Sequence, residues 1–332
     1  MALVSDARVS SSPIRAHVSR LLGPRHLVFE EEAIDPGSLA TGEIAIATEF
    51  SAISPGTELA AYSGLAPLRP GPVYPRLVGY CNCGRVLGVG RNVTRVRAGD
   101  RVLTNAAHRS HYRTSEVDIL ALVPADLDGA CAAVAYLFHL GYAALLSAKV
   151  KAGQRVAVIG LGALGMTSVA MARAAGARVV AVSHRDRALA QARCFGADET
   201  RRIDDPGNTE ADADVVITTS NDWDDWLLAL RAARRGGTIA VLGFPGRGQP
   251  PASFNPLDSQ YFYDKQLTVM AVGQTGDAEL ARNMAHLLEL IAAEKLPALA
   301  LARDVRPAGE LQAAYEDLLR RPDDVLTYVL QW

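Results

Sequence analysis

The stretch Val156-Ala157-Val158-Ile159-Gly160-Leu161-Gly162-Ala163-Leu164-Gly165 decides the fold, because it joins a short apolar run directly to a glycine-rich turn. The apolar run predicts a buried strand, and the alanine-rich residues after the turn predict a helix that continues to Ala175 and stops at Gly176. Residues 178–182 then predict a second strand. This order of strand, turn, helix and strand is typical of a βαβ unit that binds a dinucleotide.

Each glycine of the turn has a physical task in such a unit. Gly160 permits the tight turn, Gly162 lets a pyrophosphate approach the backbone, and Gly165 allows the helix to pack closely on the strand. The first helical residues, Ala163 and Leu164, offer free N–H groups and the positive end of the helix dipole to the phosphates. An accidental glycine turn is the alternative, and the flanking strand and helix argue against it.

The end of the second predicted strand indicates which dinucleotide is bound. A protein that binds NAD usually places an acid there, about 20 residues on, to hold the ribose 2′-OH. Here Ser183-His184-Arg185 occupies that place. The small neutral serine does not repel a 2′-phosphate, and a guanidinium pairs with a phosphate in bidentate fashion. These residues predict NADP as the cofactor; the alternative is a solvated helix start with Asp186 near its cap.

Composition and charge fit a soluble enzyme with a small-molecule substrate. The chain has 332 residues, enough for two domains, and 34 basic against 36 acidic residues argue against a nucleic-acid partner. Arg, Lys, His or Asp interrupts every long apolar run, so we expect no membrane span, and the N-terminus lacks the pattern of a signal peptide. Four cysteines without paired spacing fit a reducing cytoplasm, which is the expected location.

The first part of the chain differs from the rest in its predicted secondary structure. Short alternating runs between Pro- and Gly-containing turns, at residues 43–48, 85–90 and 100–103, predict a compact β domain that gives way to helix from about Asp128. Further strands and helices are predicted after the glycine turn, at residues 215–217, 224–233, 238–242, 267–272 and 280–293. A helix over residues 309–319 and a strand over 325–330 are expected to return to the β domain.

Two further motifs accompany the glycine turn, Gly79-x-x-x-x-Gly84-x-Val86-x-x-Val89-Gly90 and Ala98-Gly99-Asp100-Arg101-Val102. With them the whole chain resembles the medium-chain dehydrogenase/reductase superfamily, which includes zinc alcohol dehydrogenases and quinone reductases. The resemblance implies an α/β fold in which a GroES-like β domain accompanies a Rossmann domain with a doubly wound parallel sheet. It places the GroES-like substrate domain at residues 1–128 and 274–332, and the NADP-binding domain at residues 129–273.

The chain departs from the zinc-dependent members of this superfamily at each expected ligand. Those members use a Cys in an early loop, a His-Glu pair in Gly-His-Glu-x-x-Gly-x-Val, and a Cys or acid before the Rossmann strand. Ser54 stands at the first position, Tyr80 and Cys81 replace the His and the acid, and the third position falls near Ala135 or Tyr136. The lobe of four cysteines that holds structural zinc in many relatives is absent too. We therefore expect no zinc.

A different metal site is the alternative. It would join Cys81 and Cys83 to His108 or His111, but this spacing is not that of a recognised zinc site. Thiols in a turn between strands are more often small hydrophobic residues of a core.

Without a metal, another group must meet the negative charge that develops on oxygen when hydride leaves NADPH for a carbonyl or a conjugated alkene. Tyr80 and Tyr136 occupy positions that would line the old metal pocket, so a phenol O–H is predicted as proton donor or oxyanion partner. Ser54, Thr57 and His139 are further candidates. The alternative is that the two tyrosines fill the volume left by zinc and its ligands, and that His139 is an ordinary core histidine.

Family position predicts other contacts. Thr218 and Thr219 should border the adenosine, and Gly243, Phe244, Val272 and Gly273 should flank the nicotinamide; ordinary packing at strand ends is the alternative. The strand at residues 267–272 lies where relatives pair across a two-fold axis, so a homodimer is expected.

Glu58 is also singled out by its loop. Loops reading Ile-Ser-x-Gly-Thr-Glu occur in enzymes resembling the hydroxyethyl-bacteriochlorophyllide dehydrogenases, which hints at a secondary alcohol or ketone on a larger molecule. Equally, Thr57 would cap a helix over residues 59–62.

The leading hypothesis is a zinc-independent, NADPH-dependent oxidoreductase that reduces a conjugated C=C, C=N or C=O of a small organic molecule, with a proton from a tyrosine hydroxyl or water. A metal-free, NADP-dependent secondary-alcohol dehydrogenase needs the same pocket and is the alternative. A non-redox cyclase or lyase and a non-catalytic NADPH-binding protein on the same fold lie outside this class. The intact glycine turn argues against the cyclase, and a pocket blocked by the two tyrosines would favour the binding protein.

Overall fold

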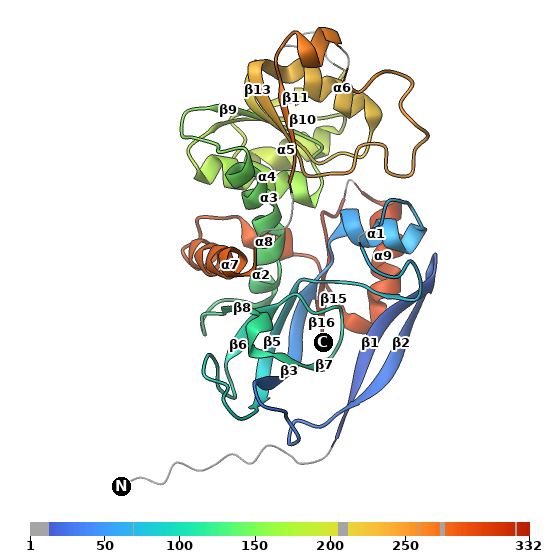
Figure 1. Ribbon diagram of the computed structural model, residues 1–332, viewed down its shortest axis with the longest axis vertical. Coiled ribbons are helices and arrows are strands. Elements are labelled where there is room, and N and C mark those ends of the chain that lie inside the picture. The colour runs from blue at the N-terminus through green and yellow to red at the C-terminus, as the bar shows by residue number, and fades with distance from the viewer. Residues whose placement is uncertain (1–12, 69, 205–211, 258, 273–275, 323) are drawn as a thin grey trace.

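The computed structural model describes residues 13–332 except 69, 205–211, 258, 273–275 and 323. Figure 1 shows two lobes, one above the other, with helices packed at their junction. The upper lobe contains a parallel sheet and the lower lobe is built from antiparallel strands. The molecule therefore has the mixed α/β architecture that the sequence predicts.

The upper lobe is built on a six-stranded sheet with the strand order β11-β10-β9-β12-β13-β14. The paired strands run parallel, and the strand before the glycine turn, β9, lies in the middle, which is the order of a doubly wound nucleotide-binding sheet. The strands are β9 (Arg155–Ile159), β10 (Arg178–Ser183), β11 (Glu199–Arg202), β12 (Ala213–Thr218), β13 (Ala233–Val241) and β14 (Thr268–Ala271). Their flanking helices are α3 (Ala135–Ser147), α4 (Ala163–Ala174), α5 (Asp186–Cys194) and α6 (Trp223–Ala232).

Local sequence explains the centre of this lobe. Val156, Ala157, Val158 and Ile159 are all fully buried, as expected for a parallel strand covered on both faces. After α4, Gly176 takes the left-handed conformation with φ of 77°, which ends the helix where the sequence predicts.

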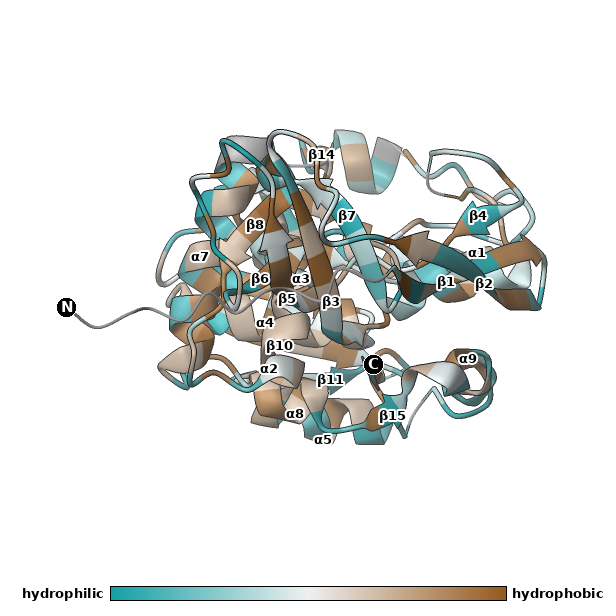
Figure 2. Cartoon of the chain, turned by 90° about the horizontal axis from the view of Figure 1, so that it is seen from below, coloured by the Kyte–Doolittle hydropathy of each residue, from teal (hydrophilic) through white to brown (hydrophobic). Residues whose placement is uncertain are grey.

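The lower lobe contains a seven-stranded sheet and a smaller three-stranded one. In the larger sheet the path is β15-β16-β3-β5-β6-β8, with β7 added to β3, and in the smaller one the order is β2-β1-β4. Figure 2 shows both hydrophilic and hydrophobic residues along β1 and β2, and over Ile14–Ser19 of β1 the two kinds alternate, as expected for a strand with one buried face. The strands are β1 (Ile14–Gly23), β2 (His26–Ile34), β3 (Glu43–Ala52), β4 (Arg76–Leu77), β5 (Asn82–Val89), β6 (Arg101–Thr104), β7 (His111–Ser115), β8 (Ile119–Leu122), β15 (Val305–Pro307) and β16 (Val329–Gln331).

The C-terminal segment returns to the lower lobe. Strand β16 pairs antiparallel with β3, so Val329 lies opposite Ala52. Helix α9 (Leu311–Arg320) contacts α1 (Pro55–Ser63), and residues from both helices share one buried cluster. The remaining helices and single turns are α2 (Gly129–Ala133), α7 (Asp277–Ala292), α8 (Ala298–Ala302), η1 (Glu116–Asp118), η3 (Ser259–Tyr263) and η4 (Ala308–Glu310).

The apolar stretch Gly129–Ser147 corrects one expectation. By length and composition alone its helices are long and apolar enough to cross a membrane, contrary to the expectation that no run is, although His139 does interrupt the run as expected. Within the protein, 78% of its most apolar part is buried. Packing of α3 against α4 and α7 explains this composition, since a helix surrounded by protein is apolar on all sides.

Two boundaries differ from the prediction. Helix α1 begins at Pro55 rather than Leu59, with Ser54 as its N-cap residue, so the expectation that Thr57 caps it is wrong. Proline is favoured in the first turn of a helix because its missing N–H is not needed there. Strand β16 covers only the last part of the predicted strand, where it finds β3 as a partner.

Candidate active site

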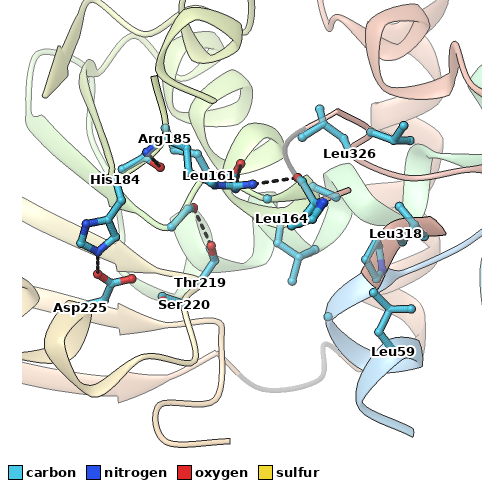
Figure 3. A pocket seen from close by; sticks show the side chains of 18 of the residues that line it. Leu59, Leu161, Leu164, His184, Arg185, Thr219, Ser220, Asp225, Leu318 and Leu326 are labelled. Carbon is cyan, nitrogen blue, oxygen red and sulfur yellow. Dashed lines mark hydrogen bonds and ion pairs between the residues drawn. The ribbon is translucent and has the colours of Figure 1, made fainter. Parts of the chain in front are cut away.

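A cavity of about 390 Å³ lies between the lobes, at the turn from β9 to α4 (Figure 3). The opposite wall comes from α1, α9 and the residues after α9, with Leu59, Leu318 and Leu326 among them. Most of the predicted cofactor contacts line this cavity together: Gly160, Gly162, Ala163, Leu164, Ser183, His184, Arg185 and Thr219. The structure thus gathers residues from the ends of three strands around one cleft.

The glycine turn has the geometry that a pyrophosphate site needs. Gly160 has a φ of 87°, and its carbonyl accepts a hydrogen bond of 2.7 Å from Thr219 Oγ1. A Cβ on Gly165 would lie 1.9 Å from the Gly160 carbonyl oxygen, so only glycine lets α4 pack this closely. A Cβ on Gly162 would meet nothing within 4 Å, which leaves room for a ligand.

Arg185 reaches across the cleft. Its guanidinium donates to the Pro322 carbonyl at 2.8 Å and to the Leu161 carbonyl, inside the glycine turn, at 3.2 Å. Ser183 is buried at the end of β10, and its Oγ accepts from the Arg185 backbone N–H. A 2′-phosphate would offer the guanidinium a charged acceptor, which forms stronger hydrogen bonds than a neutral carbonyl does.

Asp225 is a cavity residue that the sequence did not indicate. It lies in the first turn of α6, is only 5% exposed, and its Oδ1 is 3.5 Å from His184 Nε2 (Figure 3). Burial raises the pKa of its carboxyl, while Ser220 and His184 oppose the rise. Acids are common in the first turn of any helix, so its sequence position gave no reason to expect a cleft residue.

The other predicted cofactor contacts lie at strand ends and are not part of this cavity wall. Thr218 is buried, and its carbonyl accepts from the N–H groups of Leu242 and Gly243. Phe244 is 42% exposed, and Val272 donates its N–H to Val241. Gly273, expected beside Val272, lies outside the described residues.

The four predicted catalytic side chains form one contiguous cluster. The Tyr80 hydroxyl donates a hydrogen bond to Ser54 Oγ, and the rings of Tyr80 and Tyr136 stack edge to face with centroids 5.3 Å apart. The Tyr136 ring lies 5.7 Å from that of His139. Three segments contribute: the start of α1, the residues before β5, and α3. Their roles stay a prediction, but their proximity makes a shared role possible.

Burial sets the protonation of this cluster. It raises the pKa of the Tyr80 phenol well above its ordinary range, chiefly by desolvation, with the hydrogen bond to Ser54 opposing the rise. The same cause lowers the pKa of His139 to about 4. Near neutral pH, Tyr80 therefore holds its proton and His139 is an uncharged imidazole.

A buried carboxylate lies directly behind this cluster. Glu58 is 2% exposed; its Oε1 accepts from the Ser54 N–H at 2.6 Å, and its Oε2 accepts from the Tyr315 hydroxyl at 2.6 Å. His108 Nε2 lies 2.8 Å from the same Oε2. A carboxylate offers only acceptors, so these three contacts together match its ionised form. The sequence indicated Glu58 by its loop, but not that it would be buried by His108 and Tyr315.

The network continues to the end of the chain. His108 Nδ1 is 2.8 Å from Ser51 Oγ, which also accepts a hydrogen bond of 2.8 Å from the Trp332 indole N–H. The indole is a donor only, so the Ser51 hydroxyl is free to donate to His108. Residues of β3, α1, α9 and the C-terminus are thus joined through consecutive polar contacts around Glu58.

Comparison with known proteins identifies the family. The sequence model of a zinc-binding dehydrogenase family matches residues 163–292. An L-threonine 3-dehydrogenase of Bacillus velezensis is 28% identical over 253 residues, 65% of this chain and 72% of that protein. An L-galactonate-5-dehydrogenase of Escherichia coli is 24% identical over 336 residues, 88% of this chain and 92% of that protein.

Solved structures agree in fold. The L-idonate 5-dehydrogenase of Escherichia coli superposes with a TM-score of 0.82, covering 96% of this chain and 99% of that one at 16% identity. The chain is a medium-chain dehydrogenase/reductase. This confirms the predicted superfamily and its fold, a GroES-like β domain with a Rossmann domain. An oxidoreductase that uses NAD or NADP is supported as well, whereas the choice between the two cofactors stays a prediction.

The zinc of many medium-chain dehydrogenases/reductases does not fit the donors found here. The hydroxyl of Ser54 is hydrogen-bonded to Tyr80, and the Glu58 oxygens are occupied by three donors. Cys83 is fully buried in the hydrophobic core, and burial raises the pKa of its thiol to about 12. Among the described residues, no three His, Cys, Asp or Glu side chains converge as a metal site would require. No catalytic step is therefore routed through zinc.

Glu58→Gln is predicted to destabilise this medium-chain dehydrogenase/reductase by about 3 kcal/mol, because an amide NH₂ would face a donor in a buried site. Urea unfolding at neutral pH measures the loss. The control is Glu31→Gln, since Glu31 is exposed and 3.8 Å from Arg15; its change should stay within about 0.5 kcal/mol. Equal losses in the two variants would contradict the role given to Glu58.

Two neighbouring glycines provide a second test. Gly165→Ala should lower the free energy of unfolding by about 2 kcal/mol or more, because its Cβ would overlap the Gly160 carbonyl. Gly162→Ala should cost about 1 kcal/mol or less, at an N-cap position with free space, yet prevent the close approach of a pyrophosphate. Unfolding curves and calorimetric NADPH titrations separate the two effects. Full NADPH affinity in Gly162→Ala would place the pyrophosphate elsewhere.

Proposed function

We propose that this medium-chain dehydrogenase/reductase is an NADPH-dependent, zinc-independent reductase of a conjugated C=C, C=N or C=O bond in a small organic molecule. The observation that supports the proposal most is the buried cluster of Ser54, Tyr80, Tyr136 and His139. Ser54 adjoins Pro55 and Gly56, which line the cavity at the glycine turn. The residue that orients the Tyr80 hydroxyl, Ser54, thus directly precedes two residues that line the dinucleotide cleft.

The chain's own residues have distinct tasks in this proposal. Bound NADPH would supply the hydride. The N–H groups at the start of α4 and the open face of Gly162 would hold the pyrophosphate, and Arg185 the 2′-phosphate. The Tyr80 hydroxyl would donate the proton, with its orientation fixed by Ser54, whose backbone is held by Glu58.

Three alternative functions make different demands on the site. A metal-free secondary-alcohol dehydrogenase would use the same pocket with Tyr80 as the base, whereas burial raises the pKa of the phenol and keeps it protonated near neutral pH. In a non-catalytic NADPH-binding protein, the two tyrosines would fill the volume that zinc and its ligands occupy in zinc-dependent relatives. A second cavity of about 280 Å³ has Thr57, Glu58, Arg76 and Tyr80 among its lining residues, so this region is not completely filled. The glycine turn argues against a cyclase or lyase.

The remaining expectations extend the proposal. We propose a homodimer that pairs β14 with its symmetry mate, since β14 ends the strand order of the six-stranded sheet. We also propose action in the cytoplasm on a small-molecule substrate, without a nucleic-acid or membrane partner.

Arg185→Ala should weaken NADPH binding by about tenfold or more and leave NADH binding within about twofold, because only NADPH offers the 2′-phosphate to a guanidinium. Calorimetric titration with each cofactor measures this. The control is Arg187→Ala, whose side chain pairs with Asp324 instead of lining the cavity. Equal losses for NADPH and NADH in Arg185→Ala would remove Arg185 from the phosphate site.

The function itself is tested by NADPH oxidation with panels of enones, imines and ketones, and by NADP⁺ reduction with secondary alcohols. With an active substrate, Tyr80→Phe should lower kcat by about 100-fold, whereas Tyr136→Phe, which keeps the ring contacts, should lower it much less. Full turnover in Tyr80→Phe would exclude this phenol as the donor. No oxidation of NADPH by any carbonyl, imine or alkene would contradict the reductase.

A further inference from the structure

Arg247 is a buried cation in the loop that follows β13. The residue is only 5% exposed. Its Nη1 donates a hydrogen bond of 2.8 Å to the Gly56 carbonyl, and its guanidinium carbon lies 3.9 Å from the centre of the Phe244 ring. Its Nε is buried without a hydrogen-bond partner among the described residues. One side of the planar guanidinium is therefore engaged, and the Nε side is not.

Such an arrangement is costly in the absence of an anion. A buried charge is stable when an opposite charge and further hydrogen bonds compensate it, and an unpartnered donor adds a penalty. In the part of the chain that the structure describes, no carboxylate forms an ion pair with Arg247. Burial correspondingly lowers the pKa of the guanidinium, and its charge interaction with Tyr80 opposes this.

The position of Arg247 relates it to the proposed chemistry. It stacks on Phe244, a residue expected to flank the nicotinamide, and it binds Gly56, which lines the cleft. The same loop contacts the lower lobe, because Gly248 donates its N–H to the Ala66 carbonyl at 3.2 Å. The guanidinium thus lies at the junction of the lobes, between the expected hydride donor and α1, the helix that follows Ser54.

We propose that Arg247 is a substrate-specificity residue that binds a carboxylate of the substrate through its Nε edge. This deepens, and rests on, the proposed reductase function. An Arg edge presents two parallel N–H donors that match the two oxygens of a carboxylate. A single guanidinium balances one negative charge, which favours a carboxylate over a phosphate dianion. The substrate class is therefore an unsaturated or carbonyl compound with a carboxylate near the reacting bond.

A purely structural role makes the opposite predictions. If Arg247 only joined the lobes through Gly56 and Phe244, its removal would lower stability, and carboxylates would bind no better than neutral isosteres. If Arg247 instead binds an anion only when substrate is present, its replacement by an apolar side chain of similar length removes an uncompensated charge from the apoprotein. The apoprotein should then be as stable or more stable.

The experiment is a calorimetric titration of the full-length protein with pentanoate, with its neutral isostere pentanamide, and with inorganic phosphate, each with and without NADP⁺. The wild type should bind pentanoate about tenfold or more tightly than pentanamide. Arg247→Met should abolish this preference and leave the Tm of the apoprotein unchanged or raised. Arg91→Met, which removes an exposed arginine, should retain the preference.

The opposite results overturn the proposal. They are equal affinities for pentanoate and pentanamide, no detectable binding of either probe, preferential binding of phosphate, or a preference that survives in Arg247→Met. Failure of the reductase function is separately visible, because NADP⁺ itself would then fail to bind while the pentanoate preference persisted.

Discussion

The buried carboxylate of Glu58 is the constraint on which the site depends. An ionised carboxylate that is excluded from water must find donors, and here they come from the Ser54 backbone, Tyr315 and His108. Tyr315 is 257 residues away in sequence, so the C-terminal helix must return to the lower lobe for the charge to be satisfied. Because Ser54 is held at one end of this network, the hydroxyl that orients Tyr80 has a fixed position.

Much of the upper lobe could be predicted because its signals are local. A fully buried run before a glycine turn defines β9 and α4, and the left-handed Gly176 ends the helix, all within consecutive residues. The lower lobe was predictable only as short alternating strands. The start of α1 was predicted too late although its signal, Pro55 after the N-cap Ser54, is local, whereas β16 is shorter than predicted because its pairing with β3 is a tertiary contact.

The site, too, was predictable where the signal lies in a sequence motif and not where it depends on tertiary contacts. Position within the family's motifs indicated Tyr80, Tyr136 and Ser54, and the structure brings these side chains together. The partners of Glu58, the acid at Asp225 and the cation at Arg247 could not be predicted, because each is defined by burial and by distant contacts. Arg247 meets a carbonyl 191 residues away. In sequence it is an ordinary arginine between two glycines, where a solvated loop is the natural expectation.

In the proposed function, the cleft between the lobes is an NADP site whose 2′-phosphate end is formed by Ser183 and Arg185. Asp225, on the same wall, is the feature that most directly opposes this, since a carboxylate there would repel a phosphate. The decisive measurement is calorimetric titration of the wild-type protein with NADPH and, separately, with NADH. We expect tight binding of NADPH and much weaker binding of NADH. Equal or reversed affinities would contradict this expectation and assign the cleft to NAD.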